Sequence, residues 1–597
     1  MKYILGISCY YHDSAACLIR DGDIVFAIQE ERLTRVKHDP AFPIMSIKEI
    51  LNRFNISFND IEVVVFYEKP FLKFERLLET YVAFAPWGTK SFYKSMPLWI
   101  KEKLFQKQQI TNELKKIDAN FDKNKIKFSE HHLSHAASAF YPSPFKEAVI
   151  LTLDGVGEWS TTTISKGSEN KIEILEEINF PHSLGLLYSA FTYFLGFTVN
   201  SGEYKLMGLA PYGEPKYKNL ILENLINVKD DGSFKMNMYY FDYATGLTMT
   251  NKNFEKLFNL KARKKDSELK KIHMDMAASV QVVIEEIILK ICKYIKTKYS
   301  CDNLCLAGGV ALNCVANGKI IKNKIFKNVW IQPASGDAGC ALGSALAYWY
   351  IEKKNSRIIS EKVDGMKNAM LGPSYSEEEI EKKLTSLSAK FEKKSYDETI
   401  NFTSESIIQG KAIGWFQGRM EFGPRALGNR SIIADPRNES MQKNLNLKIK
   451  YRESFRPFAP ALLRENISDF FDLDVDSPYM LVVSEIKEGK KISSDSNSEL
   501  NGLEKLNYKR SEIPAITHVD YSARLQTVDH NSNKKFYDLI KSFYKKTGVA
   551  VLINTSFNVR GEPIVCTVED AYKCFLKTNL DILVIENFIL LKNEQIK

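Results

Sequence analysis

One arrangement of strands and turns occurs twice in the chain, and it constrains the fold more than any other feature. Apolar stretches bounded by turn residues predict three short strands, with Asp21-Gly22 as a hairpin turn, at residues 3–8, 15–20 and 23–29. Three more short strands, again separated by Gly-rich turns, are predicted at residues 148–153, 160–165 and 171–178. Two α/β halves that each begin with such a meander predict a duplicated domain with a cleft between the copies. Chance similarity of two meanders is the alternative.

Helices are expected after each meander. Residues 101–127 are rich in Lys and amphipathic, which predicts a solvated surface helix, and residues 272–297 carry apolar residues at helical spacing. The polar segment that follows Tyr350 is typical of a domain boundary. We therefore expect one domain over residues 1–355 and a second, also α/β, over residues 370–597.

In the second domain, strands are expected at residues 412–417 and 548–553, and a polar loop should follow the latter from Asn554. Residues 487–510 are polar and poor in aromatic side chains. That composition predicts a mobile surface insertion.

The composition is that of a soluble globular protein. The 597 residues are 44% hydrophobic, and 82 Lys and Arg against 73 Asp and Glu leave a formal charge of +9. An excess this small and diffuse does not indicate a nucleic-acid partner. The nine scattered cysteines suit reduced thiols and a cytoplasmic location. The uncharged stretch 178–202 is too polar to span a membrane, so we expect a buried helix that ends near Gly196 and no membrane partner.

Two histidines and two aspartates form a candidate metal site. His131 and His135 are four residues apart, so on a helix both imidazoles lie on one face. Asp154 closes an apolar strand, and Asp337 stands in a Gly-rich turn before an apolar helix. Two neutral imidazoles and two carboxylates would bind Fe(II), Mn or Zn and leave positions open for substrate oxygens. Spacing alone also allows a second interpretation, in which the aspartates cap helices and the histidine pair is structural.

Gly-rich turns recur where strands meet helices, at residues 154–157, 307–313 and 335–339. Such turns let backbone N–H groups approach phosphate oxygens. The phosphate-binding pattern GxxxxGK[ST] is absent from the sequence, and each turn alone is weak evidence. Three of them in a domain with a duplicated meander favour a nucleotide-binding cleft.

The second domain carries a dense run of basic residues with few acids among them: Arg419, Arg425, Arg430, Arg437, Lys448, Lys450, Arg452 and Arg456. Guanidinium groups bind phosphate in a bidentate manner, and a buried Arg needs an anionic partner. Interleaved Phe, Leu, Ile and Pro indicate that part of the run is buried, in contrast to a solvated basic face. Nucleic-acid binding is the alternative, but the aromatic spacing is not that of a stacking platform.

Single polar residues near these motifs are weaker candidates. His12 stands in the turn of the first hairpin, beside Asp13, where it would act as a general base or serve a structural role. Lys37 and His38 would contact an acceptor or be surface charge, and the sequence leaves both interpretations open.

Taken together, these segments resemble one known family. The motifs that carry the resemblance are GISCYYHDSAACLIRDGDIVFAIQEER, HHLSHAASAFYPSPF, LDGVGEW, SGEYKLMGLAPYG, GGVALN, SGDAGCALG, GRMEFGPRALGNRSI, FRPFAP and INTSFN. They run in the family's order from about residue 3 to the last strand. By these motifs the chain is similar to the O-carbamoyltransferases of nodulation-factor and antibiotic tailoring, the NodU/CmcH type.

The resemblance implies a fold and a two-step reaction. The N-terminal domain would be a duplicated actin/sugar-kinase/Hsp70-like domain, and the C-terminal domain would be YrdC-like. In such enzymes the C-terminal domain converts carbamoyl phosphate and ATP to carbamoyl-adenylate. The N-terminal domain then passes the carbamoyl group to an acceptor hydroxyl and releases AMP. The implied partner is a small-molecule or sugar acceptor, and a homodimer is compatible with the sequence.

The resemblance also assigns roles to residues. The expected metal ligands are His131, His135, Asp154 and Asp337, with Fe²⁺ expected first and Mn²⁺ or Zn²⁺ as alternatives. His12 would be the catalytic residue and, with Lys37, would approach the acceptor. The residues expected to line the adenylate site are Gly308, Gly309 and Asn313. Carbamoyl phosphate and ATP, the latter with Mg²⁺, would be held by Arg419, Lys450, Arg452 and Asn554. The segment 487–510 matches no family motif.

Two other functions stay open at this point. A tRNA-modifying relative would transfer a threonylcarbamoyl group to adenosine and would need a basic face on the N-terminal domain. Residues 1–350 carry no dense basic patch apart from 101–127, which disfavours it. A non-catalytic nucleotide sensor on the same fold would have no need of an open metal site.

Overall fold

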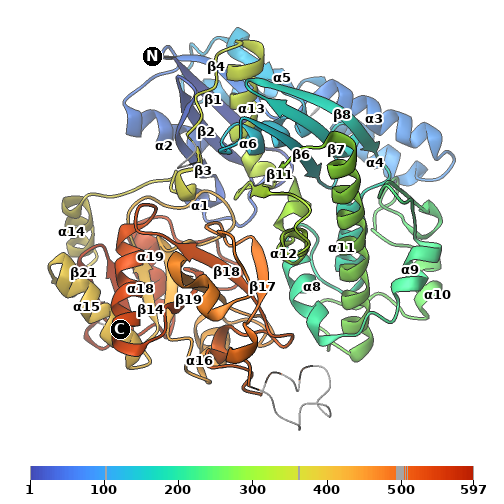
Figure 1. The fold of residues 1–597 in the computed structure, drawn as a ribbon. Helices are drawn as coiled ribbons and strands as arrows, with labels where there is room; N and C mark the ends of the chain where they lie inside the picture. Colours follow the sequence, from blue (N-terminus) through green and yellow to red (C-terminus); the bar gives the residue numbers. More distant parts are fainter. Residues whose placement is uncertain are drawn as a thin grey trace. The chain divides into compact units, whose positions relative to one another are not determined.

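The computed structural model describes residues 2–100, 104–360, 364–492, 503, 506 and 508–595. The chain forms two compact units (Figure 1). Unit 1 contains the residues up to Glu30 and then Asp39–Gly365, and unit 2 contains Met366–Lys597 together with Glu31–His38. No helix in the described part of the chain is long and apolar enough to cross a membrane. Most of the predicted insertion 487–510 lies outside the described residues.

The first half of unit 1 is built on a five-stranded sheet with the order β3-β2-β1-β4-β5. The predicted meander is confirmed as β1 (Tyr3–Ser8), β2 (Ala15–Arg20) and β3 (Asp23–Gln29), which pair in antiparallel fashion. β4 (Ile61–Phe66) pairs in parallel with β1, and β5 (Ile126–Phe128) pairs in parallel with β4. α2 (Ile44–Phe54) connects β3 to β4.

The second half repeats this topology, with the order β8-β7-β6-β11-β12. β6 (Glu147–Leu153), β7 (Ser160–Ser168) and β8 (Lys171–Asn179) form the second antiparallel meander. β11 (Asn303–Ala307) pairs in parallel with β6, and β12 (Asn328–Ile331) pairs in parallel with β11. Strand order and strand direction agree between the halves, so the predicted duplication is confirmed.

The last strand of each half leads into an equivalent helix. α6 (His131–Phe140) follows β5, and α13 (Asp337–Ala347) follows β12. Each helix packs on the sheet of the other half, α6 on β6, β7 and β11, and α13 on β1, β2 and β4. The two helices also pack on each other, so the interior of unit 1 is layered as sheet, helix, helix, sheet (Figure 1).

Further helices surround these layers. In the first half they are α3 (Pro70–Ala83), α4 (Thr89–Trp99) and α5 (Gln106–Lys115). In the second half they are α7 (Leu184–Phe194), α8 (Glu203–Leu209), α9 (Lys218–Asn224), α10 (Lys252–Phe258), α11 (Lys271–Tyr299) and α12 (Cys314–Lys322), with a small hairpin of β9 (Ile226–Val228) and β10 (Phe234–Met236). The helices predicted to end near Gly196 and to cover 272–297 are confirmed by α7 and α11.

Of the predicted long helix over residues 101–127, residues 101–103 lie outside the described residues, α5 confirms a helix from Gln106 to Lys115, and the prediction is wrong beyond Lys115. The Asp118 and Asp122 carboxylates accept backbone N–H bonds from the residues two positions later, which closes turns. Ile126 then pairs with Val64 as part of β5. Local turn chemistry and strand pairing therefore override a helical pattern that rested on Lys-rich composition.

Unit 2 is a nine-stranded mixed sheet with the order β13-β21-β20-β14-β15-β19-β16-β18-β17. The strands are β13 (Glu392–Lys393), β14 (Ile413–Phe416), β15 (Arg430–Ala434), β16 (Ala459–Leu463), β17 (Val482–Glu485), β18 (Ser522–Val528), β19 (Val551–Ser556), β20 (Ile582–Ile585) and β21 (Phe588–Leu591). The helices are α1 (Glu31–Thr34), α14 (Glu377–Ser386), α15 (Tyr396–Ile408), α16 (Met441–Asn444), α17 (Ile467–Phe470), α18 (Lys534–Thr547) and α19 (Val568–Lys577).

One expectation for unit 2 is wrong. Asn554 was predicted to open a polar loop, but it lies inside β19, between Ile433 of β15 and Ala459 of β16. Pairing with two neighbouring strands carries the backbone through Ser556 as strand although the side chains there are polar.

Candidate metal centre and basic cluster

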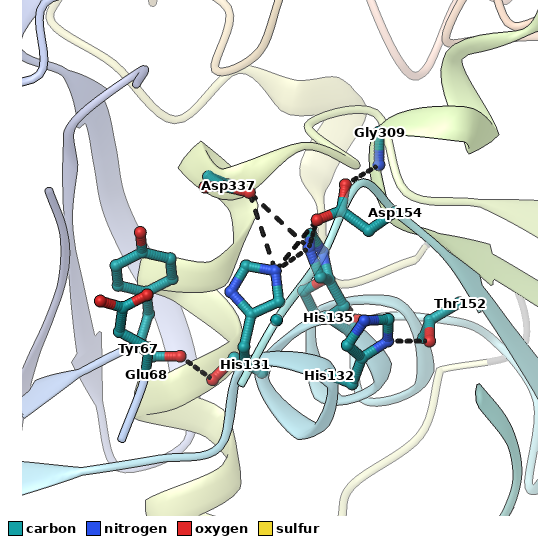
Figure 2. Close-up of polar contacts among 12 residues, drawn as sticks. Tyr67, Glu68, His131, His132, His135, Thr152, Asp154, Gly309 and Asp337 are labelled. Atoms are coloured by element: carbon teal, nitrogen blue, oxygen red, sulfur yellow. Dashed lines mark hydrogen bonds and ion pairs between the residues drawn. The ribbon is translucent and has the colours of Figure 1, made fainter. Parts of the chain in front are cut away.

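Four potential metal ligands converge in unit 1. His131 and His135 lie on the first two turns of α6, Asp154 directly follows β6, and Asp337 is the first residue of α13. Their ligand atoms all lie within 4.8 Å of one another, and all but Asp154 are fully buried. Figure 2 shows both imidazoles turned toward the two carboxylates. The first half of the domain supplies both imidazoles, and the second half supplies both carboxylates.

The separations among these atoms are those of ligands around one ion. The Nε2 atoms of His131 and His135 are 3.1 Å apart, and Asp154 Oδ2 lies 3.1 Å from the first and 3.8 Å from the second. Asp337 Oδ1 lies 3.9 and 3.8 Å from the same two nitrogens. A metal–ligand distance of about 2.1 Å places neighbouring ligands about 3.0–3.4 Å apart in octahedral or tetrahedral geometry. Small inward movements would therefore seat a divalent cation.

The hydrogen-bonding of the four residues is incomplete without a cation. Among the described residues, Asp337 Oδ2 is buried and has no hydrogen-bond partner. The two facing Nε2 atoms are at hydrogen-bonding distance, where only one of them can donate to the other. Buried polar atoms are rarely left in this state. A shared cation with a preference for nitrogen and oxygen ligands, such as Fe²⁺, Mn²⁺ or Zn²⁺, fits this set of donors.

The carboxylates dominate the electrostatics of the site. Burial lowers the pKa of His131, but the hydrogen bond to Asp154 and the charge of Asp337 outweigh burial and raise the pKa to about 9. Burial would raise the pKa of Asp154, yet the two histidines hold it well below its usual value. Both shifts show a centre that favours positive charge.

Hydrogen bonds from the loops after β6 and β11 hold two of the four residues, His131 and Asp154, in place. Both carboxylate oxygens of Glu158 accept the backbone N–H of His131, at 3.0 Å each, at the N-terminus of α6. The Gly309 N–H donates to Asp154 Oδ1 at 2.9 Å. Sequence reasoning missed Glu158, although it stands in the LDGVGEW motif. A single acid gives no sign in the sequence that it caps a helix 27 residues away.

His12 lies beside the candidate metal centre, in the loop after β1. This loop is the counterpart of the one after β6 that carries Asp154. His12 Nε2 is 3.8 Å from Asp337 Oδ2, and Nδ1 is 3.0 Å from Asp13 Oδ2. Burial lowers the pKa of His12, but Asp337 and Asp13 outweigh burial and raise it to about 9. Asp13 therefore fixes the orientation of the ring and leaves Nε2 on the side of the metal ligands.

The predicted nucleotide-binding residues lie in the segment between β11 and α12, where the Gly309 N–H contacts Asp154. Gly308 follows β11 with a φ of +88°, and a Cβ there would lie 2.2 Å from Leu153 O, so glycine is required. Asn313 caps α12, since its Oδ1 accepts the Ala316 N–H at 3.1 Å. Its amide also exchanges two hydrogen bonds of 3.1 Å with Gln281. Asn313 therefore has a structural role, and its predicted contact with nucleotide stays a prediction.

A basic cluster forms in unit 2. Its members are linked by electrostatic repulsion that adds to the effect of burial and lowers the pKa values of Lys450, Arg452 and Arg456. They are Lys37, Arg425, Lys450, Arg452, Arg456, Arg524 and Arg560. The Lys450 ammonium is buried and donates to Ser556 O at 2.6 Å and to Asn558 Oδ1 at 2.6 Å. Burial lowers the pKa of Lys450 well below its usual value, and Arg452, Arg456 and Lys37 add to the effect. Arg452 and Arg456 are half-buried, Lys37 and Arg560 are exposed, and Glu453, 3.9 Å from Arg456 and 3.6 Å from Arg560, offsets part of the charge. The remaining excess of cations favours binding of an anion.

Lys37 reaches this cluster through the segment Glu31–His38, which packs as part of unit 2. Arg35 anchors the segment, because its guanidinium donates to Ile564 O and Pro563 O at 2.7 Å each. The predicted role of Lys37 toward an acceptor stays a prediction, but its position groups it with the cations of unit 2.

The remaining predicted residues of unit 2 make mainly structural contacts. Arg419 donates to Gly372 O at 3.1 Å and to Leu371 O at 2.5 Å. Asn554 Nδ2 donates to Ala426 O at 3.1 Å, beside Arg425, and its buried Oδ1 has no hydrogen-bond partner in the described part of the chain.

Arg430, from the same basic run, departs from the expectation that a buried Arg needs an anionic partner. Its guanidinium stacks on the Phe416 ring, 3.5 Å from the centroid, and donates to backbone carbonyls, including Gln417 O at 2.6 Å.

Comparison with known proteins identifies the family. A family model described as Carbamoyltransferase N-terminus matches residues 3–346, and one described as Carbamoyltransferase C-terminus matches residues 404–592. The chain belongs to the carbamoyltransferase family. The predicted resemblance and the predicted α/β fold class are thereby confirmed, and the protein is a transferase of the NodU/CmcH type.

Three relatives illustrate the range of this carbamoyltransferase family. An uncharacterized protein of Synechocystis sp. is 54% identical over 100% of this chain and 97% of its own length. Nodulation protein NolNO of Sinorhizobium fredii is 36% identical over 98% of this chain and 79% of its own length. The 3'-hydroxymethylcephem-O-carbamoyltransferase of Streptomyces clavuligerus is 30% identical over 45% of this chain and 44% of its own length.

Proposed function

We propose that the protein is an ATP-dependent O-carbamoyltransferase that works in two steps. Unit 2 would form carbamoyl-adenylate from carbamoyl phosphate and ATP, and unit 1 would transfer the carbamoyl group to a hydroxyl of a small molecule or sugar. The observation that carries the proposal is the convergence of four ligand atoms and His12 within unit 1. A hydroxyl acceptor is supported by the name of the cephem O-carbamoyltransferase relative.

The basic cluster of unit 2 supports the activating step. In a balanced reaction, water cleaves carbamoyl phosphate to carbamate and phosphate, and a carbamate oxygen then attacks the α-phosphorus of ATP. The bond to the β-phosphate breaks, and pyrophosphate leaves. Both substrates are polyanions, and Arg452 and Arg456 are half-buried cations whose pKa values are lowered by desolvation and by the charge of neighbouring arginines. Phosphate binding would relieve the repulsion between them.

The transfer step uses the residues around the metal centre. A divalent cation held by the two histidines and two aspartates would polarise the carbonyl of the carbamoyl group. His12 Nε2 would accept the proton of the acceptor hydroxyl as the hydroxyl oxygen bonds to the carbonyl carbon. The bond from that carbon to the phosphate oxygen breaks, and AMP leaves. Asp13 would keep the His12 ring in the tautomer that presents an unprotonated Nε2.

The proposal is tested by following phosphate, pyrophosphate and AMP while the full chain is incubated anaerobically with ATP, carbamoyl phosphate and Fe²⁺. Pyrophosphate should form without an acceptor and should be lost in Arg456→Gln. Arg464→Gln is the matched control, because Arg464 is exposed and pairs only at the surface with Asp476. ATP cleavage driven by threonine and bicarbonate instead would favour the tRNA-modifying alternative. Turnover of neither substrate pair would favour a sensor.

A further inference from the structure

Large apolar side chains gather at the surface of one part of unit 1. Seven side chains within 35 residues of sequence are more than a third exposed: Phe71, Leu72, Val82, Trp87, Tyr93, Ile100 and Phe105. Three of them, Val82, Trp87 and Tyr93, are 77%, 76% and 75% exposed. They belong to α3, α4 and the segments next to these helices. Clusters of this kind mark interaction surfaces, whereas isolated exposed apolar residues do not.

The exposed residues lie on a helical hairpin whose inner face is already packed. Tyr81 of α3 contacts the rings of Phe92 and Trp99 of α4, at centroid distances of 5.3 and 5.7 Å. On α4, Tyr93 and Ile100 are seven residues apart and therefore share one helical face. Their exposed face is separate from the ring contacts that hold the hairpin together.

α4 packs on its buried side against a loop outside the two helices. The Ser91 hydroxyl donates to Thr245 O, and a Cβ at Gly88 would lie 2.6 Å from the Thr245 Cβ. This contact fixes the N-terminus of α4 and leaves Trp87, Tyr93 and Ile100 exposed. We call these three residues the aromatic patch.

The charge along α4 has one sign, in contrast to α3, which carries the exposed Glu75 and Glu79 between Phe71 and Val82. Residues 80–100 contain no Asp or Glu, and Lys90 and Lys94 of α4 are exposed beside Tyr93. An apolar face rich in Trp, Tyr and Phe, flanked by Lys, is typical of helices that lie in the interface of an anionic bilayer. α4 has only 11 residues, which is too short to cross a bilayer but long enough to lie on its surface.

We propose that the aromatic patch docks unit 1 on an anionic membrane surface. Trp87, Tyr93 and Ile100 enter the headgroup region, and Lys90 and Lys94 face the lipid phosphates. α3 also contacts the loop of the candidate metal centre, since Arg76 donates to Gly157 O at 2.8 Å. Docking through this hairpin therefore holds the metal centre near the bilayer. The proposal does not depend on the reaction proposed above.

Co-sedimentation of the full chain with phosphatidylcholine vesicles, with and without phosphatidylglycerol, tests the docking. The wild type should bind the anionic vesicles. Lys90→Gln/Lys94→Gln should weaken that binding by about 30-fold, because each lysine near the surface contributes about 1 kcal/mol. Trp87→Ser/Tyr93→Ser should weaken it by about tenfold or more. Matched controls are Lys382→Gln/Lys545→Gln in unit 2 and Ile358→Ser, which removes an apolar side chain that is 94% exposed.

A second measurement does not depend on the folding of multiple variants. Trp87 is the exposed one among the six tryptophans, so lipids with brominated acyl chains should quench its fluorescence, and Trp87→Phe should abolish the quenching while keeping the binding. Absence of binding to anionic vesicles, or quenching that persists in Trp87→Phe, would overturn the proposal. A dimer that is disrupted by Trp87→Ser/Tyr93→Ser, with no vesicle binding, would instead assign the patch to a second copy of the chain.

Discussion

Gly343 lies at a close contact between α13 and α6, the two helices that carry three of the four candidate metal ligands. A Cβ at Gly343 would lie 1.8 Å from Ser134 O of α6, and an ordinary contact begins at about 3.4 Å, so Gly343→Ala requires α13 and α6 to separate by about 1.6 Å. The distances from Asp337 to His131 and His135 span the same interface. Metal sites tolerate deviations of only about 0.2 Å in ligand distance. We expect metal affinity to fall by about 100-fold or more, and overpacking to lower the free energy of unfolding by about 1–3 kcal/mol.

The assay is a Co²⁺ titration followed by visible absorption, together with thermal unfolding of the metal-free protein. Gly336→Ala is the matched control, because Gly336 precedes the same helix and no described atom lies within 4 Å of a Cβ placed there. Gly336→Ala should keep both the affinity and the unfolding temperature of the wild type. If Gly343→Ala binds Co²⁺ as tightly as the wild type, the packing of α13 on α6 does not set the ligand geometry, and the reasoning is refuted.

The roles proposed for three other residues each predict a measurable change. His12→Ala should lower carbamoyl transfer by about 10²–10⁴-fold while pyrophosphate still forms without an acceptor; equal loss of both products would contradict a role in transfer alone. Glu158→Gln should weaken Co²⁺ binding by about 10–100-fold, because it loosens the N-terminus of α6, and an unchanged titration would show that Glu158 serves only the fold. Burial lowers the pKa of Lys450, so this lysine should lose its proton, and with it an attraction for phosphate, at a lower pH than an exposed lysine. The KM for carbamoyl phosphate should therefore rise as the pH is raised toward 10, and it should rise less in Lys450→Arg; a KM that does not vary with pH would argue against contact with Lys450.

The strands of unit 1 could be predicted because their signals are local. β1, β2 and β3 are apolar runs separated by turn residues, and the structure places them at the predicted positions. α11 has helical periodicity over most of its 29 residues, and it too was predictable. The conformation of residues 116–128 was not predictable from local sequence. It depends on the pairing of Ile126 with Val64, which is 62 residues away in sequence.

The candidate metal centre shows a different limit of sequence reasoning. The spacing of His131 and His135 indicates one helical face, but Asp154 and Asp337 join them only through the layering of α6 and α13. The four residues could be predicted as a set from the family resemblance and not from spacing. In unit 2 the basic run was visible, yet nothing in the sequence separates Arg430, which is held by carbonyls and Phe416, from Arg456, which lies in the cationic cluster.

The division of the site between the two halves of unit 1 has an energetic consequence. The first half supplies the imidazoles of His131, His135 and His12, and the second half supplies the carboxylates of Asp154 and Asp337. Without a cation, the two carboxylates are balanced by protonated histidine, which is why the pKa values of His131 and His12 are raised to about 9. A divalent cation would replace those protons and free His12 to act as a base at neutral pH. In the proposed mechanism, loading of the centre and readiness of His12 for proton transfer would therefore be linked by the same two carboxylates.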